Sequence, residues 1–208
     1  MNPKKSSTNE GAQVIQEYRS LMRTISGKAN QEEKKLIRKA FKTAIEAHEN
    51  VRRKSGDLYI THPISVAKII ANDIGLGPTS IICSLLHDVV EDTSLTIKDI
   101  EADFGSEISL IINGLTKISG VVDADVSLQA ENFRKMILTI SNDIRVVLIK
   151  IADRLDNMRT LQYLKPEKQA RIASETLYLY APLAHRLGLY SIKTELEDLS
   201  LKYTESDV

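Results

Sequence analysis

Helical periodicity is the feature of this sequence that most restricts its fold. Beyond residue 11, apolar side chains recur at the spacing of one helix face in nearly every segment, and no strand-like alternation runs longer than four residues. Residues 78–91 are apolar on almost all sides, which predicts a buried central helix. The sequence therefore predicts an all-α protein.

Turn and cap residues set the expected boundaries of the helices. Asn30 is placed to cap a helix, Pro63 and Pro78 each suit a first helical turn, and Pro182 predicts a kink or a late break. Residues 1–11 are expected to be a disordered tail ahead of a single domain over 12–208. The loops are expected at 51–61 and 119–128, and the helices at 12–25, 31–50, 62–74, 78–91, 96–105, 106–118, 131–140, 143–164, 167–186 and 192–201.

Composition excludes several classes of protein. Lys plus Arg and Asp plus Glu each number 28, so there is no basic excess to favour nucleic-acid binding. No segment approaches the ~20 apolar residues of a membrane span, and the N-terminus lacks the apolar stretch of a secretory signal. The single Cys83 lies in an apolar run and reads as a small buried side chain in a reducing compartment. We therefore expect a cytoplasmic protein.

Three separated segments supply a set of metal ligands. They contribute His62, the adjacent His87 and Asp88, and Asp153. Two imidazoles and two carboxylates can hold one divalent cation and leave positions open for water, as a catalytic metal site requires. Without a thiolate the set suits Mn²⁺ well, while Zn²⁺, Fe²⁺, Co²⁺ and Mg²⁺ stay open on ligand type.

An acidic pair follows the second ligand segment. In a helix, Glu91 would lie on the same face as His87, and Asp92 on the same face as Asp88. Carboxylates at a helix C-terminus oppose the helix dipole, which argues against the plain alternative of a solvated helix end. We interpret Glu91 and Asp92 as the groups that handle protons and water in metal-assisted hydrolysis.

Two further segments suggest contacts to a phosphorylated ligand. Arg52, Arg53 and Lys54 are consecutive in a Gly-containing loop before His62, although at least one of them is expected to be only a solvated charge. After Asp153, Asn157 and Thr160 continue a polar line along one helix face. The alternative is that this line faces water and pairs with neighbouring arginines.

The order of a His, a His-Asp pair and an Asp on successive helices resembles the HD phosphohydrolase superfamily. RKSGDLYITHP, LLHDVVEDT, IKIADRLDNMRTL and YAPLAHRLGLYSIKTELEDLSLKY more closely resemble the N-terminal hydrolase domain of the long RelA/SpoT homologues, over roughly residues 14–205. The resemblance implies an HD-domain helical bundle that hydrolyses the alarmones ppGpp and pppGpp.

The resemblance also implies roles for matching residues. His62, His87, Asp88 and Asp153 match Mn²⁺ ligands, and Glu91 and Asp92 match a catalytic acidic pair. The positions that match nucleotide contacts are Arg53, Lys54, Ser55, Asn157 and Thr160. Asp156 departs from the family pattern, in which His is expected, and this affects only local detail.

The leading hypothesis is thus metal-dependent removal of the 3′-pyrophosphate of (p)ppGpp, giving GDP or GTP. Two alternatives stay open: hydrolysis of another nucleotide, and a non-catalytic module that senses a nucleotide. In long family members a synthetase domain and regulatory domains follow, and the last helix, about 190–205, resembles the connector to the synthetase. We expect no membrane contact and no direct nucleic-acid binding.

Overall fold

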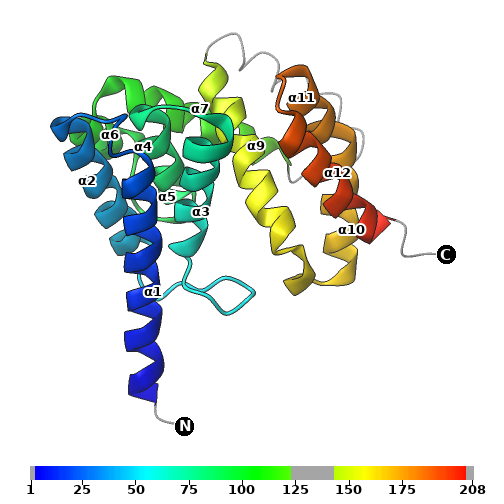
Figure 1. The fold of residues 1–208 in the computed structure, drawn as a ribbon, viewed down its shortest axis with the longest axis horizontal. Helices are drawn as coiled ribbons and strands as arrows, with labels where there is room; N and C mark the ends of the chain where they lie inside the picture. The colour runs from blue at the N-terminus through cyan, green and yellow to red at the C-terminus, as the bar shows by residue number, and fades with distance from the viewer. Residues whose placement is uncertain (1–2, 123–142, 205–208) are drawn as a thin grey trace. The chain divides into compact units, whose positions relative to one another are not determined.

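The computed structural model describes residues 3–122 and 143–204 (Figure 1). Within those ranges every regular element is a helix, and one isolated antiparallel bridge joins Arg52 to Leu58. The all-α prediction is therefore confirmed. The chain divides into two compact units, Met1–Thr116 and Lys117–Val208, where its length predicts a single domain. Among the described helices, none is both long and apolar enough to cross a membrane.

The elements of each unit follow one another in chain order. The first unit contains α1 (Pro3–Thr24), α2 (Gln31–Ala47), α3 (Thr61–Ile69), the π-helical turn η1 (Ile70–Ile74), α4 (Pro78–Leu86), α5 (Val89–Asp92), α6 (Ile97–Phe104) and the start of α7 (Ser106–Val122). The second contains α9 (Ile144–Arg159), the 3₁₀ turn η3 (Leu161–Tyr163), α10 (Pro166–Glu175), the π-helical turn η4 (Thr176–Tyr180), α11 (Ala181–Arg186) and α12 (Tyr190–Thr204).

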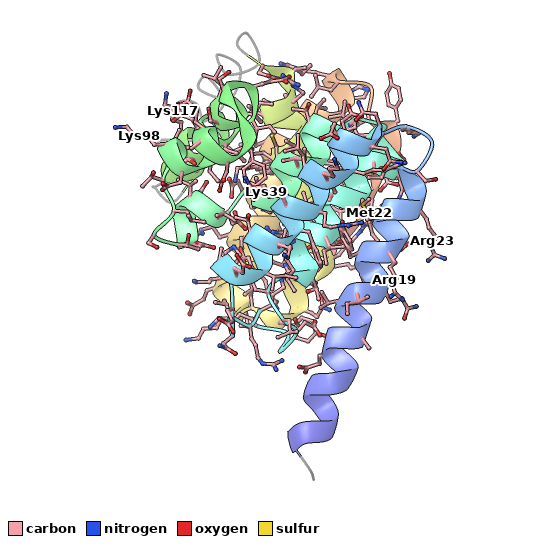
Figure 2. The ribbon with its side chains drawn as sticks, turned by 90° about the vertical axis from the view of Figure 1, so that its left-hand side faces the viewer. Arg19, Met22, Arg23, Lys39, Lys98 and Lys117 are labelled. Carbon is pink, nitrogen blue, oxygen red and sulfur yellow. The ribbon has the colours of Figure 1, made fainter. Side chains whose placement is uncertain are left out.

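Helix α4 is the core of the first unit. It packs against α2 and α3, and every residue from Ser80 to Leu86 is buried. This matches the all-round apolar pattern of its sequence. Lys39 of α2 pairs with Asp103 of α6 at 2.5 Å on the surface, where Figure 2 labels the lysine. The residues that follow α4 are therefore attached to a buried helix in the core of this unit.

Helix α12 is central to the second unit, where it packs against α9, α10, η4 and α11. Arg159 of α9 donates two hydrogen bonds to Glu195 of α12, at 2.6 and 2.8 Å. Arg154 of α9 pairs with Glu175 at 3.1 Å and lies over the ring of Tyr180. These contacts hold α9 to its neighbours on two sides.

The N-terminal helix is longer than the sequence predicts. Helix α1 begins at Pro3 and continues to Thr24, so it includes residues 3–11 of the expected tail. Val14, Leu21 and Ile25 are buried and hold the later part of this helix. Once a helix is nucleated, each further residue adds a hydrogen bond at little cost, so a polar segment can extend it.

The central helix is interrupted where the sequence predicts continuity. Residues 78–91 do not form one helix, because α4 ends at Leu86 and α5 begins at Val89. His87 and Asp88 keep right-handed backbone angles between them, with φ of −59° and −99°. The apolar period runs on through the break, so periodicity alone does not reveal it.

The other boundaries agree with the expected helices within a few residues. Asn30 caps α2 in a reciprocal pair with Glu33, and Pro63, Pro78 and Pro166 each lie in a first turn. Pro182 lies in the first turn of α11, directly after the π-helical turn η4, so the helix expected over 167–186 is interrupted there. Residues 119–122 of the expected loop belong to α7, and the rest of that loop and the expected helix 131–140 lie outside the described residues.

Candidate metal centre

Two buried imidazoles of the first unit meet at one carboxylate. The rings of His62 and His87 are 5.1 Å apart between centroids. The Nε2 atom of His87 lies 3.1 Å from Oδ2 of Asp88, and Nε2 of His62 lies 3.7 Å from the same oxygen. The side chain of His87 is fully buried, that of His62 is 4% exposed and that of Asp88 is 17% exposed. Three predicted ligands thus lie within reach of one small ion.

Local structure fixes both imidazoles. His62 lies in the first turn of α3, and the proline after it restricts its backbone. His87 lies directly after α4, and its Nδ1 is 2.8 Å from the carbonyl oxygen of Ser84. A carbonyl only accepts, so Nδ1 carries the proton and Nε2 keeps its lone pair for a metal or a proton.

Tyr59 is a member of this cluster that the sequence did not reveal. Its hydroxyl donates to Oδ2 of Asp88 in a short hydrogen bond and also lies 3.2 Å from Oδ2 of Asp92. His48, which directly follows α2, contacts the Tyr59 ring in a tilted arrangement with centroids 4.3 Å apart. Burial lowers the pKa of His48, although Asp88 and Asp92 oppose this. Tyr59 lies in the turn three residues before His62, and nothing in the local sequence marks its role.

The acidic pair lies on α5, directly after the break. Glu91 and Asp92 are both exposed, whereas Asp88 is half-buried. The backbone N–H of Asp92 donates to the carbonyl of Asp88 at 2.9 Å, and Tyr59 joins the two side chains. The pair is therefore attached to the buried cluster through Asp92 and is open to water.

The cationic residues before His62 lie in a short hairpin loop, here defined as residues 52–58. Arg53 N–H donates to the carbonyl of Asp57 at 2.9 Å, and Ser55 Oγ donates to the Asp57 carboxylate at 2.7 Å. Arg52 is turned instead to Glu10 of α1, with which it forms a salt bridge of 2.9 Å. Of the three consecutive cations, Arg52 is thus engaged within the protein.

The remaining predicted residues belong to the second unit. Asp153 lies on α9, where Asn157 Nδ2 donates to its Oδ1 at 2.7 Å and Lys150 Nζ lies 3.5 Å from its Oδ2. Thr160 follows the helix and bonds to the carbonyls of Asp156 and Asn157, each at 3.3 Å. Lys150, buried one turn before Asp153, is a neighbour that the sequence reading missed.

The donor set of the first unit suits a divalent cation. Imidazole nitrogens and a carboxylate oxygen, without thiolate, are ligands for Mn²⁺, Fe²⁺, Zn²⁺ and related ions. Burying two imidazole nitrogens beside a carboxylate costs free energy unless the lone pairs and the negative charge are compensated, and a cation provides that compensation. These residues of the first unit therefore fit a divalent cation.

Comparison with known proteins places this arrangement in a family. A model of the HD domain matches residues 40–190, which include every predicted ligand. A protein of Synechocystis sp. named as a probable guanosine-3′,5′-bis(diphosphate) 3′-pyrophosphohydrolase is 51% identical over 83% of this chain and 23% of its own. The bifunctional (p)ppGpp synthase/hydrolase SpoT of Escherichia coli is 47% identical over 89% of this chain and 26% of its own.

A solved structure agrees with these relatives. It belongs to a metazoan ortholog of SpoT that is described as hydrolysing ppGpp and acting in starvation responses. It is 26% identical, covers 82% of this chain and 92% of its own, and superposes with a TM-score of 0.52. The chain spans about a quarter of the length of the curated relatives it matches. On the family match over residues 40–190, the chain belongs to the HD domain family.

Proposed function

We propose that this chain hydrolyses ppGpp and pppGpp at the 3′-pyrophosphate, giving GDP or GTP and pyrophosphate. The observation that carries the proposal is the meeting of two buried imidazoles, His62 and His87, at the carboxylate of Asp88. The relatives named as 3′-pyrophosphohydrolases support the choice of substrate. We predict that the reaction takes place in the cytoplasm as part of the stringent response.

His62, His87, Asp88 and Asp153 are the ligands that would hold the metal, which we propose to be Mn²⁺. When bound, such an ion polarises a phosphate oxygen and makes water more acidic. On α9, the hydrogen bond that Asp153 accepts from Asn157 and its ion pair with Lys150 fix the orientation of its carboxylate. Hydrogen-bond partners that orient a ligand in this way raise its affinity for the metal.

We propose that Glu91 and Asp92 act in proton transfer from the attacking water. In hydrolysis, the oxygen of water adds to the phosphorus bound to the 3′ oxygen, and the bond between that phosphorus and the 3′ oxygen breaks. Glu91 or Asp92 accepts the proton from water, and the departing 3′ oxygen takes up a proton. The exposed position of this pair, bonded to the cluster through Tyr59, supports the assignment.

The hairpin loop is proposed to bind the nucleotide. Arg53 and Lys54 supply positive charge for a polyanion, and the planar guanidinium of Arg53 also suits stacking on a guanine ring. Ser55 lies at the same tip, and Asn157 and Thr160 are proposed to contact the nucleotide from the end of α9.

A substrate panel tests the proposal against hydrolysis of another nucleotide. Purified chain with Mn²⁺ is given ppGpp, pppGpp, GTP, GDP and a deoxynucleoside triphosphate at equal concentration, and kcat/KM is measured for each. We expect turnover only of the two alarmones. Faster turnover of a nucleotide without a 3′-pyrophosphate assigns another substrate, and bound metal without any turnover assigns a sensing module.

A further inference from the structure

The hairpin loop is closed on itself by main-chain bonds. Arg52 and Leu58 form an antiparallel bridge, Tyr59 N–H donates to the carbonyl of Val51 at 3.0 Å, and Gly56 N–H donates to that of Arg53 at 2.9 Å. Gly56 has a φ of 96°, which a glycine adopts without strain. These bonds fix the shape of the tip that carries Arg53, Lys54 and Ser55, and the contacts of the loop with the helices around it fix its position.

Arg52 holds both the loop and its neighbour. Its Nη1 donates to the carbonyl of Gly56 at 2.7 Å and to Oε1 of Glu10 at 3.2 Å, and its Nη2 donates to Oε2 of Glu10 at 2.9 Å. Such a two-pronged contact fixes direction as well as distance. The hydrogen bond from Arg52 lowers the pKa of Glu10, so this carboxylate is ionised at neutral pH.

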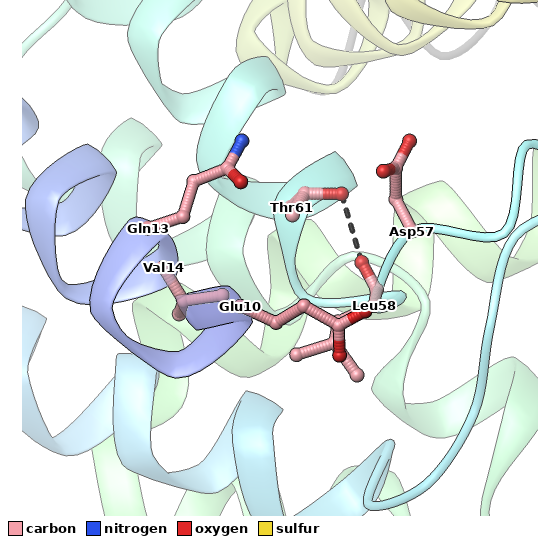
Figure 3. A pocket seen from close by; sticks show the side chains of 6 residues that line it. All are labelled: Glu10, Gln13, Val14, Asp57, Leu58 and Thr61. Atoms are coloured by element: carbon pink, nitrogen blue, oxygen red, sulfur yellow. Dashed lines mark hydrogen bonds between the residues drawn. The ribbon is translucent and has the colours of Figure 1, made fainter. Parts of the chain in front are cut away.

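Glu10 is a firm point of attachment because its helix is anchored. Val14, Leu21 and Ile25 bury one side of the helical segment, and Glu17 pairs with Lys68 of α3. Arg19 and Arg23 lie on its exposed side (Figure 2). A small pocket lies between α1 and the loop (Figure 3), and its lining residues are Glu10, Gln13, Val14, Asp57, Leu58 and Thr61.

The contact between Glu10 and Arg52 connects α1 to the hairpin loop beside the pocket. Figure 3 shows Glu10 extending from α1 towards Leu58, while Thr61 Oγ1 donates to the Leu58 carbonyl at 2.8 Å and ties the loop to α3. The loop is thus tied to α3 at its end and to α1 at its start. Loss of the α1 tie lets the tip populate other positions, and substrate affinity falls in proportion to the remaining competent fraction.

We propose that Glu10 is a positioning residue for substrate binding, which through Arg52 holds the loop bearing Arg53, Lys54 and Ser55 in place. The proposal rests on the proposed function of that loop as the nucleotide contact. It assigns a role to the N-terminal segment that lies outside residues 40–190 of the family match. Glu10 touches no reacting atom, so its effect is on KM and not on the chemical step.

The test compares Glu10→Ala with Glu17→Ala, which breaks another ion pair of the same helix but one directed to α3. We expect Glu10→Ala to raise KM for ppGpp by roughly two- to fivefold, the range of an exposed ion pair, with kcat unchanged. The increase should shrink at high salt, because exposed charges are screened. Glu17→Ala should leave KM at the wild-type value.

A double-mutant cycle shows whether Glu10 acts through Arg52. In an Arg52→Met background, Glu10→Ala should change KM no further. An equal increase in both backgrounds overturns the proposal, as does a wild-type KM in the single Glu10→Ala variant.

An activity-independent readout separates this proposal from the proposed function. Trypsin should cleave after Lys54 faster in Glu10→Ala than in wild type or Glu17→Ala, because the loop opens more often. Unchanged cleavage overturns the positioning role. If Glu10→Ala is cleaved faster but the wild type does not turn over ppGpp, the substrate assignment is rejected. The structural role of the contact between Glu10 and Arg52 then stands.

Discussion

Tyr59 shows how one residue can organise a site built from ionisable groups. It bonds to Asp88, a predicted ligand, and to Asp92, a predicted proton acceptor. Its ring also contacts His48 in a tilted arrangement and His62 in an edge-on one. A neutral hydroxyl between two carboxylates lessens their repulsion and fixes which oxygens stay open to a ligand. The predicted ligand Asp88 and the predicted proton acceptor Asp92 are therefore linked through one hydroxyl.

Replacing both members of the acidic pair separates chemistry from binding. In Glu91→Gln/Asp92→Asn, we expect turnover of ppGpp to fall by ~10²–10⁴-fold, the usual range of general acid–base assistance. Folding and nucleotide affinity should change little, because both side chains are exposed. Single-turnover kinetics and nucleotide titration measure the two effects. If the double variant turns over ppGpp at the wild-type rate, the pair is only a solvated helix end. If the double variant loses its metal, the pair belongs to the metal ligands.

At the scale of helices, the interruption between α4 and α5 shapes the site. Helix α4 ends at Leu86, and at the turn of His87 and Asp88 the Asp88 carboxylate lies near both imidazoles. Asp92 stays one helical turn after Asp88, because its N–H donates to the Asp88 carbonyl at 2.9 Å. The buried helix α4 holds His87 at its end, and the turn after it sets the position of the Asp88 side chain.

Helix α9 carries the proposed fourth ligand, and its start is capped by Asp143. The Asp143 carboxylate accepts from the backbone N–H of Arg145 at 2.9 Å and from the Arg145 guanidinium at 2.7 Å. We expect Asp143→Ala to reduce the free energy of unfolding by about 1 kcal/mol, the usual value of an N-cap. Asp143→Asn is the control, because it keeps a cap acceptor and loses only the charge.

The contribution of the Asp143 charge to the free energy of unfolding depends on pH with a defined sign. The hydrogen bond from the Arg145 side chain lowers the pKa of Asp143, although burial opposes it. A carboxyl whose pKa is lower in the folded state stabilises it above its ordinary pKa, and this stability disappears as pH falls through the folded value. Urea unfolding should therefore show the difference between wild type and Asp143→Asn at neutral pH, and the two should converge in strong acid. A constant difference would contradict the ionic part of the account.

For the whole molecule, the sequence predicts elements better than it predicts their junctions. Caps and prolines such as Asn30, Pro63 and Pro78 act locally, so the helix starts that they mark are confirmed. The break after Leu86 and the extension of α1 to Pro3 depend on tertiary packing and on helix propagation, which periodicity does not report. The contact between Glu10 and Arg52 joins distant exposed residues, and no local pattern marks it.

The candidate site divides in the same way. The residue types and their order predicted that His62, His87 and Asp88 would share a site, and the first unit brings these three together. The roles of Tyr59, His48 and Lys150 were not predictable, because a tyrosine, a histidine and a lysine beside apolar residues are each common in cores and surfaces alike. Their assignment needs the packed structure.

The most direct test of the central claim follows the products of ppGpp hydrolysis by the purified chain while Mn²⁺ is titrated, in parallel with Asp153→Ala. Ion-exchange chromatography resolves GDP, pyrophosphate and phosphate. We predict equal amounts of GDP and pyrophosphate from the wild type, no turnover with a chelator, and a steep rise in the Mn²⁺ that Asp153→Ala requires. Phosphate released in place of pyrophosphate, or an unchanged Mn²⁺ requirement in Asp153→Ala, would contradict the account.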